Sequence, residues 1–424
     1  MKGKLSSERL FAFRPHAYSI LAILSFIIAL SISDASASNA ISVVFGPKQY
    51  TRTTGNPNHF LDAFQAAAGS ATIEIKNGSA TGGNRVTSAV IYLNGRQIFS
   101  PSDFKQGVYD LKKPVVLNNG TNILETELRS KPGSYLSIIA NAVIVRTIDI
   151  TIASPSDGAT VIGSNVMVNG TVTNSAGVET GVTVNGTIAA VSSNNEFAAN
   201  HVPLTEGTNT ITVRATDATG TTATKTVTVN AIKANSYIKL RAYPDSGVAP
   251  LEVTLRFSGS FSIANPVITP SGPGSVEQLV SENPDEYKYR IATEGFYAFA
   301  ATVNGPDGNT YTDRISIPVL SLTQIDTLLR TKWAGLQNAL TNRDIPTALN
   351  LLRPVSRSRY QTMFNLLRDK LPVIVAAHTD LILDSIEGNF AFYELKTLEN
   401  GSVFSYRVIF ARDPSSGLWL IEEF

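Results

Sequence analysis

Histidine is the residue most often used for proton transfer and for zinc binding, and this chain has four histidines in 424 residues. His16 lies near the N-terminus, and His59, His201 and His378 are far apart in the sequence. The spacings HxxxH and HExxH, which place two metal ligands on one helix face, do not occur. A three-histidine zinc site is therefore not expected.

Other motifs for catalysis or phosphate binding are also missing. The chain has no cysteine, which excludes disulfides, a thiol nucleophile, a thiolate metal site and a lipid-anchored cysteine. No GxSxG elbow, Walker loop or GxGxxG motif opens a helix after a strand. The sequence accordingly predicts no catalytic residue and no bound cofactor.

Calcium is the one metal that the sequence leaves open, because hard oxygen ligands often lie between β modules. Asp157, Asp217, Asp307 and Asn309 all occupy expected turns. Carboxylates and amides are favoured in turns for local bonding to the backbone, and the EF-hand spacing is absent. We therefore expect these four side chains to stabilise their turns and do not favour a calcium site.

A cluster of arginines marks one charged surface near the C-terminus. Arg353, Arg357, Arg359 and Arg368 fall in a basic stretch, and the last 45 residues are mainly acidic. These arginines would form either a contact patch for an acidic partner or a solvated helix face paired with the acidic strands, and the second is preferred.

The N-terminus has the features of an export signal. A basic start is followed by the apolar run 20–30 and by two candidate cleavage points, Ala35-Ser36-Ala37 and Ser38-Asn39-Ala40. The apolar run is shorter than the roughly 18 residues of a spanning helix, so an uncleaved anchor is disfavoured and no transmembrane span is expected after signal removal. Residues 1–40 carry four basic and two acidic groups, which leaves the rest of the chain near −1 (+1 minus +2). Such a charge does not indicate nucleic-acid binding.

The mature chain divides into stretches with different patterns. Residues 41–147 and 148–233 both contain alternating strands joined by Asn-Gly turns, typical of β-sandwiches. Each also repeats the motif VxLxxGTN, with glycine at 120 and at 207 and an apolar residue (Leu124, Ile211) two positions after the asparagine, 20-odd residues after a hairpin Asn-Gly. Two copies of one β-sandwich plan explain this repeat, with Asn122 and Asn209 making local hydrogen bonds at the turn.

Two further stretches complete the chain. Residues 234–320 predict a third sandwich. From 321 to 424 the pattern changes to an amphipathic helix over 322–343, helices over 344–352 and 356–371 with the last ended by Pro372, and four strands. The predicted fold class is mainly β: tandem immunoglobulin-like β-sandwich modules followed by a C-terminal α+β domain.

Several of these stretches resemble known families. Through VTVNGT, VPLTEGTNTITVRATDATG and TVTV, residues 148–232 resemble the immunoglobulin-like domain B of glucodextranase. Through GVAPLEVTL and YKYRIATEGFYAF, residues 235–319 are similar to a polycystic-kidney-disease-type (PKD) sandwich. The first module, through RVTSAVIYLNG, resembles a domain of exported bacterial proteins, and the tail resembles the cone fold of nuclear transport factor and ketosteroid isomerase in its helix pattern and closing GxWxIxxF. These resemblances imply an exported protein of adhesive, spacing or binding modules.

A cone fold can hold a pocket between its helices and its sheet. The aromatic residues that would line such a pocket, or form the core in its place, are Trp333, Phe364, Phe390, Phe392, Tyr406 and Trp419. The core is the preferred interpretation. No residue matches the catalytic motif of a steroid isomerase, so enzyme activity is not expected.

The function expected from these features is that of a non-catalytic surface or periplasmic protein. It would act as an adhesion or spacer unit and as a binding scaffold for a protein or polysaccharide of the cell envelope. One alternative is a glycan-binding accessory unit, which would expose aromatic residues of the third module: Tyr237, Tyr243, Tyr287, Tyr289, Phe296, Tyr297 and Phe299. The other is a small-molecule-binding or enzymatic C-terminal domain.

Overall fold

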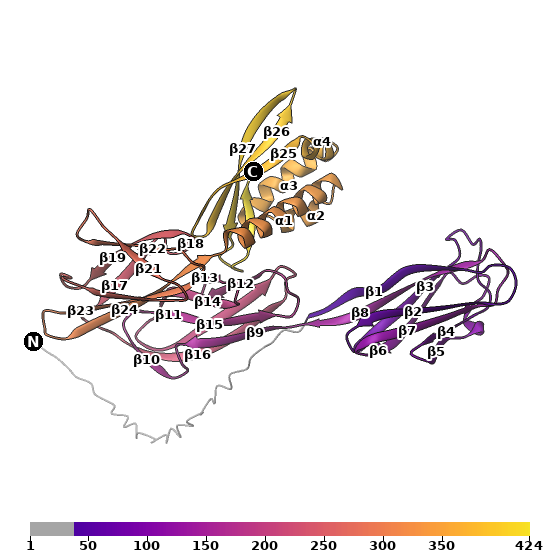
Figure 1. The fold of residues 1–424 in the computed structure, drawn as a ribbon, viewed down its shortest axis with the longest axis horizontal. Coiled ribbons are helices and arrows are strands. Elements are labelled where there is room, and N and C mark those ends of the chain that lie inside the picture. The colour runs from indigo at the N-terminus through magenta and orange to yellow at the C-terminus, as the bar shows by residue number, and fades with distance from the viewer. Residues whose placement is uncertain (1–37) are drawn as a thin grey trace, which may run out of the picture. The chain divides into compact units, whose positions relative to one another are not determined.

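The computed structural model describes residues 38–424, and the predicted signal peptide falls outside them except for its last three residues. The first strand begins at Ser38, directly after the Ala35-Ser36-Ala37 motif. The described part of the chain has twenty-eight strands, four α-helices and one short 3-10 helix, in the order drawn in Figure 1. The mainly β fold class is confirmed, and every α-helix of the described residues lies after residue 321. Across residues 38–424, every helix is too short or too polar to cross a membrane.

The N-terminal sandwich consists of two four-stranded sheets, β1-β8-β3-β6 and β2-β7-β4-β5. Its strands are β1 (Ser38–Thr51), β2 (Asn58–Ala66), β3 (Gly69–Asn77), β4 (Ala89–Leu93), β5 (Arg96–Phe99), β6 (Asp110–Leu117), β7 (Gly120–Leu128) and β8 (Tyr135–Arg146). The 3-10 helix η1 (Pro101–Asp103) lies between β5 and β6. Alternate residues such as Ile73, Ile75, Leu136 and Ile138 are buried between the two sheets, as period-two burial requires.

The second sandwich has all its strands joined in one eight-stranded hydrogen-bonded order, β10-β16-β15-β12-β13-β14-β11-β9. These are β9 (Ile148–Ser154), β10 (Ala159–Ile162), β11 (Asn165–Asn174), β12 (Thr180–Val184), β13 (Thr187–Val191), β14 (Glu196–Pro203), β15 (Gly207–Asp217) and β16 (Thr222–Ile232). Its core is small-residue rich, with Val168, Val182, Ile211 and Val213 fully buried.

The repeated motif forms the same local structure in both sandwiches. Asn122 accepts a 2.8 Å hydrogen bond from the N–H of Asn118 and donates to its carbonyl, and Asn209 makes the same two bonds to Thr205, at 2.9 and 2.6 Å. Gly120 and Gly207 have φ of +87° and +91°, a region that glycine enters without strain. The predicted structural role of the repeat, a turn followed by a strand, is confirmed.

The third sandwich pairs β17-β19-β22-β21 against β18-β24-β23-β20. Its strands are β17 (Ile238–Tyr243), β18 (Gly247–Val248), β19 (Leu251–Gly259), β20 (Val267–Ser271), β21 (Val276–Leu279), β22 (Glu286–Ile291), β23 (Gly295–Asn304) and β24 (Thr310–Leu320). Three of the seven aromatic residues that the glycan-binding alternative would expose lie inside instead. Tyr289, Tyr297 and Phe299 belong to the buried core, because they alternate inward along β22 and β23.

The C-terminal domain packs four helices against one antiparallel sheet, β25-β26-β27-β28. The helices are α1 (Leu322–Thr341), α2 (Ile345–Asn350), α3 (Pro354–Leu366) and α4 (Leu371–Ala376), and the strands are β25 (His378–Glu387), β26 (Phe390–Glu399), β27 (Ser402–Arg412) and β28 (Trp419–Glu423). The expectation that Pro372 ends the third helix was wrong. α3 stops at Leu366, and Pro372 occupies the first turn of α4, where its missing N–H costs no hydrogen bond.

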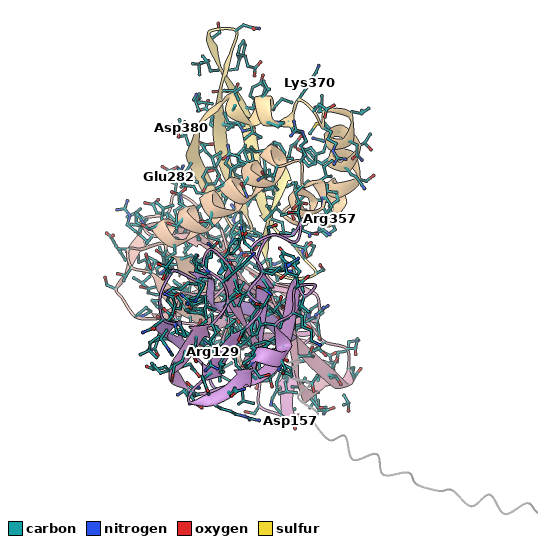
Figure 2. All side chains as sticks on the ribbon, turned by 90° about the vertical axis from the view of Figure 1, so that its right-hand side faces the viewer. Arg129, Asp157, Glu282, Arg357, Lys370 and Asp380 are labelled. Atoms are coloured by element: carbon teal, nitrogen blue, oxygen red, sulfur yellow. The ribbon has the colours of Figure 1, made fainter. Side chains whose placement is uncertain are left out.

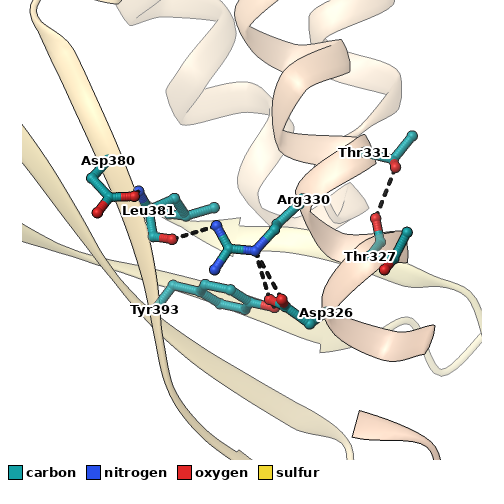
Figure 3. A network of polar contacts seen from close by, with 7 residues as sticks. All are labelled: Asp326, Thr327, Arg330, Thr331, Asp380, Leu381 and Tyr393. Carbon is teal, nitrogen blue, oxygen red and sulfur yellow. Dashed lines mark hydrogen bonds and ion pairs between the residues drawn. The ribbon is translucent and has the colours of Figure 1, made fainter. Parts of the chain in front are cut away.

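A polar network fixes α1 on the sheet. Arg330 Nε lies 2.9 Å from both carboxylate oxygens of Asp326, one turn earlier on α1, and its Nη1 donates a 2.6 Å bond to the carbonyl of Leu381 in β25. The buried Tyr393 hydroxyl of β26 donates to Asp326 at 2.9 Å (Figure 3). Burial, and then the hydrogen bond to Asp326, raise the pKa of Tyr393, so the phenol stays protonated and remains the donor.

Candidate functional site

The six aromatic residues expected in a C-terminal pocket or core occupy different environments. Trp333, Phe364 and Trp419 are buried in the core. Phe390 and Tyr406 are 44% and 45% exposed, and Phe392 is half-buried. Phe392 and Tyr406 line a depression of about 400 Å³ on the sheet. The six side chains therefore do not converge on one cavity.

Packed rings occupy the space between the helices and the sheet. Phe424, the last residue, lies 5.3 Å from Trp333 and 4.7 Å from Tyr360 between ring centroids. Tyr360 Oη accepts a hydrogen bond from the N–H of Phe424 and donates one to its carbonyl, at 2.8 and 2.9 Å. His378 stacks on Trp333 at 5.9 Å, and burial lowers its pKa.

The four arginines of the predicted patch have different partners. Arg353 forms an ion pair with Glu422, and Arg359 lies 3.4 Å from Glu423, both in β28. Arg357, which is labelled in Figure 2, donates to the carbonyl of Leu352, and Arg368 is exposed. Two of the four therefore pair with the acidic C-terminal strand.

The three aspartates considered as calcium ligands accept hydrogen bonds from nearby protein groups. Asp157 accepts from the N–H of Thr228 at 2.7 Å. Asp217 accepts from the N–H groups of Thr219 and Thr221, and Asp307 from those of Asn309 and the hydroxyl of Tyr311. Among residues 38–424, no group of three or more His, Asp or Glu side chains is arranged to hold a metal ion.

The other four aromatic residues considered for glycan binding in the third sandwich differ in exposure. Tyr237 and Tyr243 are about half exposed, and Phe296 is half-buried. Tyr287 packs against the core and against Phe257, with their ring centroids 5.7 Å apart. A continuous aromatic face for glycan binding is therefore not formed by these seven residues.

The most unusual group of charges lies where the second sandwich meets the C-terminal domain. Glu179, just before β12, accepts a 2.8 Å hydrogen bond from the N–H of Trp419 in β28, and its other oxygen lies 2.7 Å from Lys332 Nζ on α1. Both charged side chains are only 10% exposed. An ion pair removed from water in this way depends on close geometry, since a lost partner leaves a buried charge.

Two glycines allow the backbones to approach each other at this contact. A Cβ on Gly181 of β12 would collide with the backbone of residues 416–418, and a Cβ on Gly417 would collide with the backbone of Val182. Gly417 ends a turn held by Asp413, whose carboxylate accepts bonds from the N–H groups of Ser415 and Ser416 at 3.2 and 3.0 Å. The close approach of the two backbones thus requires a residue without a side chain on each of them.

Arg412 is the second buried cation at this contact. It is 7% exposed, its Nη1 donates a long 3.3 Å bond to the carbonyl of Ala189, and its guanidinium lies 5.1 Å from the ring centroid of Trp419. Burial lowers the pKa of Arg412 to about 10, against the opposing effect of Glu179 and Asp245. The group is therefore still charged at neutral pH.

A cleft of about 700 Å³ opens beside these charges. The second sandwich contributes Asn174, Glu179, Thr180, Ser192, Ser193 and Asn195, and the C-terminal domain contributes Gln324, Ile325, Leu328, Arg412 and Trp419, among others. This volume falls within the range of small-ligand sites.

Of the residues of this cleft, sequence reasoning had named only Trp419, as a possible pocket or core residue, although a second signal was present. Lys332 stands three residues after Leu329 and four before Leu336, on the apolar face of α1. A lysine in such a position needs a partner when the face is buried, but the sequence alone does not show that the partner is Glu179, 153 positions earlier (332 minus 179).

One family model and several solved structures are similar to parts of this chain. Residues 148–232 match the family described as glucodextranase, domain B. Among solved structures, the chain is similar to fibronectin(III)-like modules of CbhA from Clostridium thermocellum, with 19% identity, 41% of this chain and 95% of that chain covered, and a TM-score of 0.17. It is also similar to the I-band fragment I67–I69 of titin, with 12% identity, coverage of 63% and 100%, and a TM-score of 0.22. No relative was found among curated proteins.

Proposed function

We propose that this chain is an exported, non-catalytic protein of the cell envelope in which three β-sandwiches space and hold a C-terminal domain of the cone-fold type. The module boundaries proposed are those of the sequence, at residues 147, 233 and 320. The partner is a protein or a polysaccharide of the envelope. The sandwich architecture and the match to a glucodextranase domain over residues 148–232 support a role in spacing or binding.

The observation that carries the proposal is the close, partly buried contact between the second sandwich and the C-terminal domain. A buried ion pair, a backbone hydrogen bond and two apposed glycines join them. The connections are also short: Thr147 alone separates β8 from β9, and Ser321 alone separates β24 from α1. A spacer needs such restrictions, because a long flexible linker would not hold its end domain in one orientation.

The test is cosedimentation of the purified protein with isolated envelopes of the bacterium that expresses it. We expect the protein to pellet with untreated envelopes. Protease treatment of the envelopes would abolish pelleting if the partner is a protein, and periodate oxidation would abolish it if the partner is a polysaccharide. A protein that stays in the supernatant with untreated envelopes contradicts the proposal.

A further inference from the structure

The cleft between the second sandwich and the C-terminal domain contains a cation without a matching anion. Arg412 Nε is buried and has no hydrogen-bond partner, and no carboxylate of residues 38–424 lies within 4.0 Å of the guanidinium. Glu179 and the exposed Asp245 act on it only as charges farther away, and Glu179 is already engaged by Lys332 and by the N–H of Trp419. A guanidinium removed from water without an anion is costly, and a carboxylate would compensate for that cost.

The rest of the cleft is lined mainly by neutral polar groups. Amide side chains at 174, 195 and 324 and hydroxyl side chains at 180, 192 and 193 provide both donors and acceptors. Ile325 and Leu328 of α1 add apolar surface, and Asp149 at the cleft is exposed. Hydroxyl-rich ligands with an apolar ring face fit this combination of groups.

We propose that the cleft binds an acidic saccharide, a uronate-containing oligosaccharide, whose carboxylate is received by Arg412 and whose hydroxyls bond to the amide and hydroxyl side chains around it. Arg412 suits this role because a guanidinium can hold a carboxylate through two parallel hydrogen bonds. This inference rests on the proposed function, since it names the ligand class of an envelope-binding protein.

Such a ligand would contact both walls of the cleft. The second sandwich and the C-terminal domain each contribute lining groups, so a bound saccharide bridges them. Binding therefore stabilises the contact made by Glu179 and Lys332, and the thermal unfolding of the protein should shift upward when the saccharide is added.

The experiment is isothermal titration calorimetry of the full chain with three probes: tetramers of galacturonate, glucuronate and mannuronate. Galactotetraose is the neutral control. At least one uronate tetramer should bind, and galactotetraose should bind at least tenfold more weakly. Arg412→Met should weaken uronate binding at least tenfold, and Arg412→Lys should lie between Arg412→Met and the unchanged protein.

Two further variants keep the test decisive. Arg256→Met is the matched control, because Arg256 also lies over an aromatic ring, that of Tyr243 at 5.5 Å, but outside the cleft. It should leave binding unchanged. Ser193→Trp places a large ring in the cleft from an exposed position, so it should block binding even if Arg412→Met fails to fold.

Four outcomes overturn the inference: no uronate tetramer binds, galactotetraose binds equally well, Arg412→Met binds as tightly as the unchanged chain, or an acidic peptide binds in place of the uronates. Failure of the inference is separable from failure of the proposed function. A protein that ignores uronates but still pellets with envelopes contradicts only the ligand class.

Discussion

Asn122 and Asn209 occupy equivalent positions in the two copies of the repeated motif, but they are not equally buried. Each side chain bonds to the backbone of the residue four positions earlier, but Asn122 is fully buried and Asn209 is partly exposed. When a buried side chain is removed, the backbone groups it served lose their partners and water does not replace them. The two residues share the turn and differ in burial and in one added bond, since Asn122 Oδ1 also accepts a 2.8 Å hydrogen bond from Asn94 Nδ2.

Asn122→Ala is expected to lower the free energy of unfolding by about 2–3 kcal/mol, and Asn209→Ala by about 1 kcal/mol, because only the first leaves buried groups unsatisfied. Chemical denaturation followed by circular dichroism measures both. Equal losses in the two variants would show that burial does not decide the cost.

His378 gives the C-terminal domain a dependence on pH. Burial lowers its folded-state pKa below the usual value of about 6.5, so the unfolded state takes up the proton first as the pH falls. The stability associated with neutral His378 is present above pH 6.5 and is lost as the pH falls from that value toward the folded-state pKa.

His378→Gln should therefore reduce the loss of thermal stability between pH 7.5 and pH 5.5, compared with the unchanged chain. Differential scanning calorimetry at the two pH values measures this difference. His59→Gln is the control, since His59 is an exposed residue of the N-terminal sandwich. A pH dependence that is identical in His378→Gln and in the unchanged chain contradicts the assignment.

At the scale of elements, α1 is held on the sheet by both apolar packing and the network of Asp326, Arg330 and Tyr393. Leu329, Trp333 and Leu336 pack into the core from the buried face of the helix. The network lies at the margin of that face and ties α1 to β25 and β26 (Figure 3). These directional bonds fix the position of the helix along the sheet more strictly than apolar contacts alone would.

Tyr393→Phe keeps the ring and removes only the hydroxyl bonded to Asp326. The expected loss is about 1–3 kcal/mol, the range for a hydrogen bond to a charged group. Thr331→Ala, which removes an exposed hydroxyl bonded within α1, is the control and should change stability by about 0.5 kcal/mol or less. Urea titration checks both, and a loss no larger than that of the control would refute the role of the hydroxyl.

At the scale of the whole molecule, the contact of Gly181 with Gly417 determines how the second sandwich meets the C-terminal domain. Gly417 and Gly401 both have positive φ, +74° and +81°, but an added Cβ would collide with Val182 at the first and meet nothing within 4 Å at the second. The two positions thus carry the same backbone strain and differ only in the contact.

Gly417→Ala should speed hydrogen–deuterium exchange in peptides that contain residues 179–184 and 417–421, because the buried Glu179 contacts open. Gly401→Ala should cost about 1 kcal/mol through φ strain alone and leave exchange in those peptides unchanged. Equal exchange in both variants would mean that the close approach is not required.

Local chemistry made much of the fold predictable. The Asn-Gly hairpins, the repeated glycine turns and the amphipathic α1 depend on neighbours within a few residues, so their patterns are visible in the sequence. The error at Pro372 has the same local origin. In a sequence, a proline in the first turn of a helix cannot be told from a proline that follows the end of a helix. Here α3 ends at Leu366, so Pro372 belongs to the first turn of α4.

The sequence by itself determined the succession of β modules and the change to helices after residue 320, because strand alternation and helix periodicity are local properties. Only the tertiary structure decided that Trp333 and Phe364 fill a core while Phe390 is exposed, and that Glu179, Lys332 and Arg412 gather at one cleft. The physical reason is that the burial of a charge depends on which distant backbones approach it, and that approach depends here on glycines at 181 and 417.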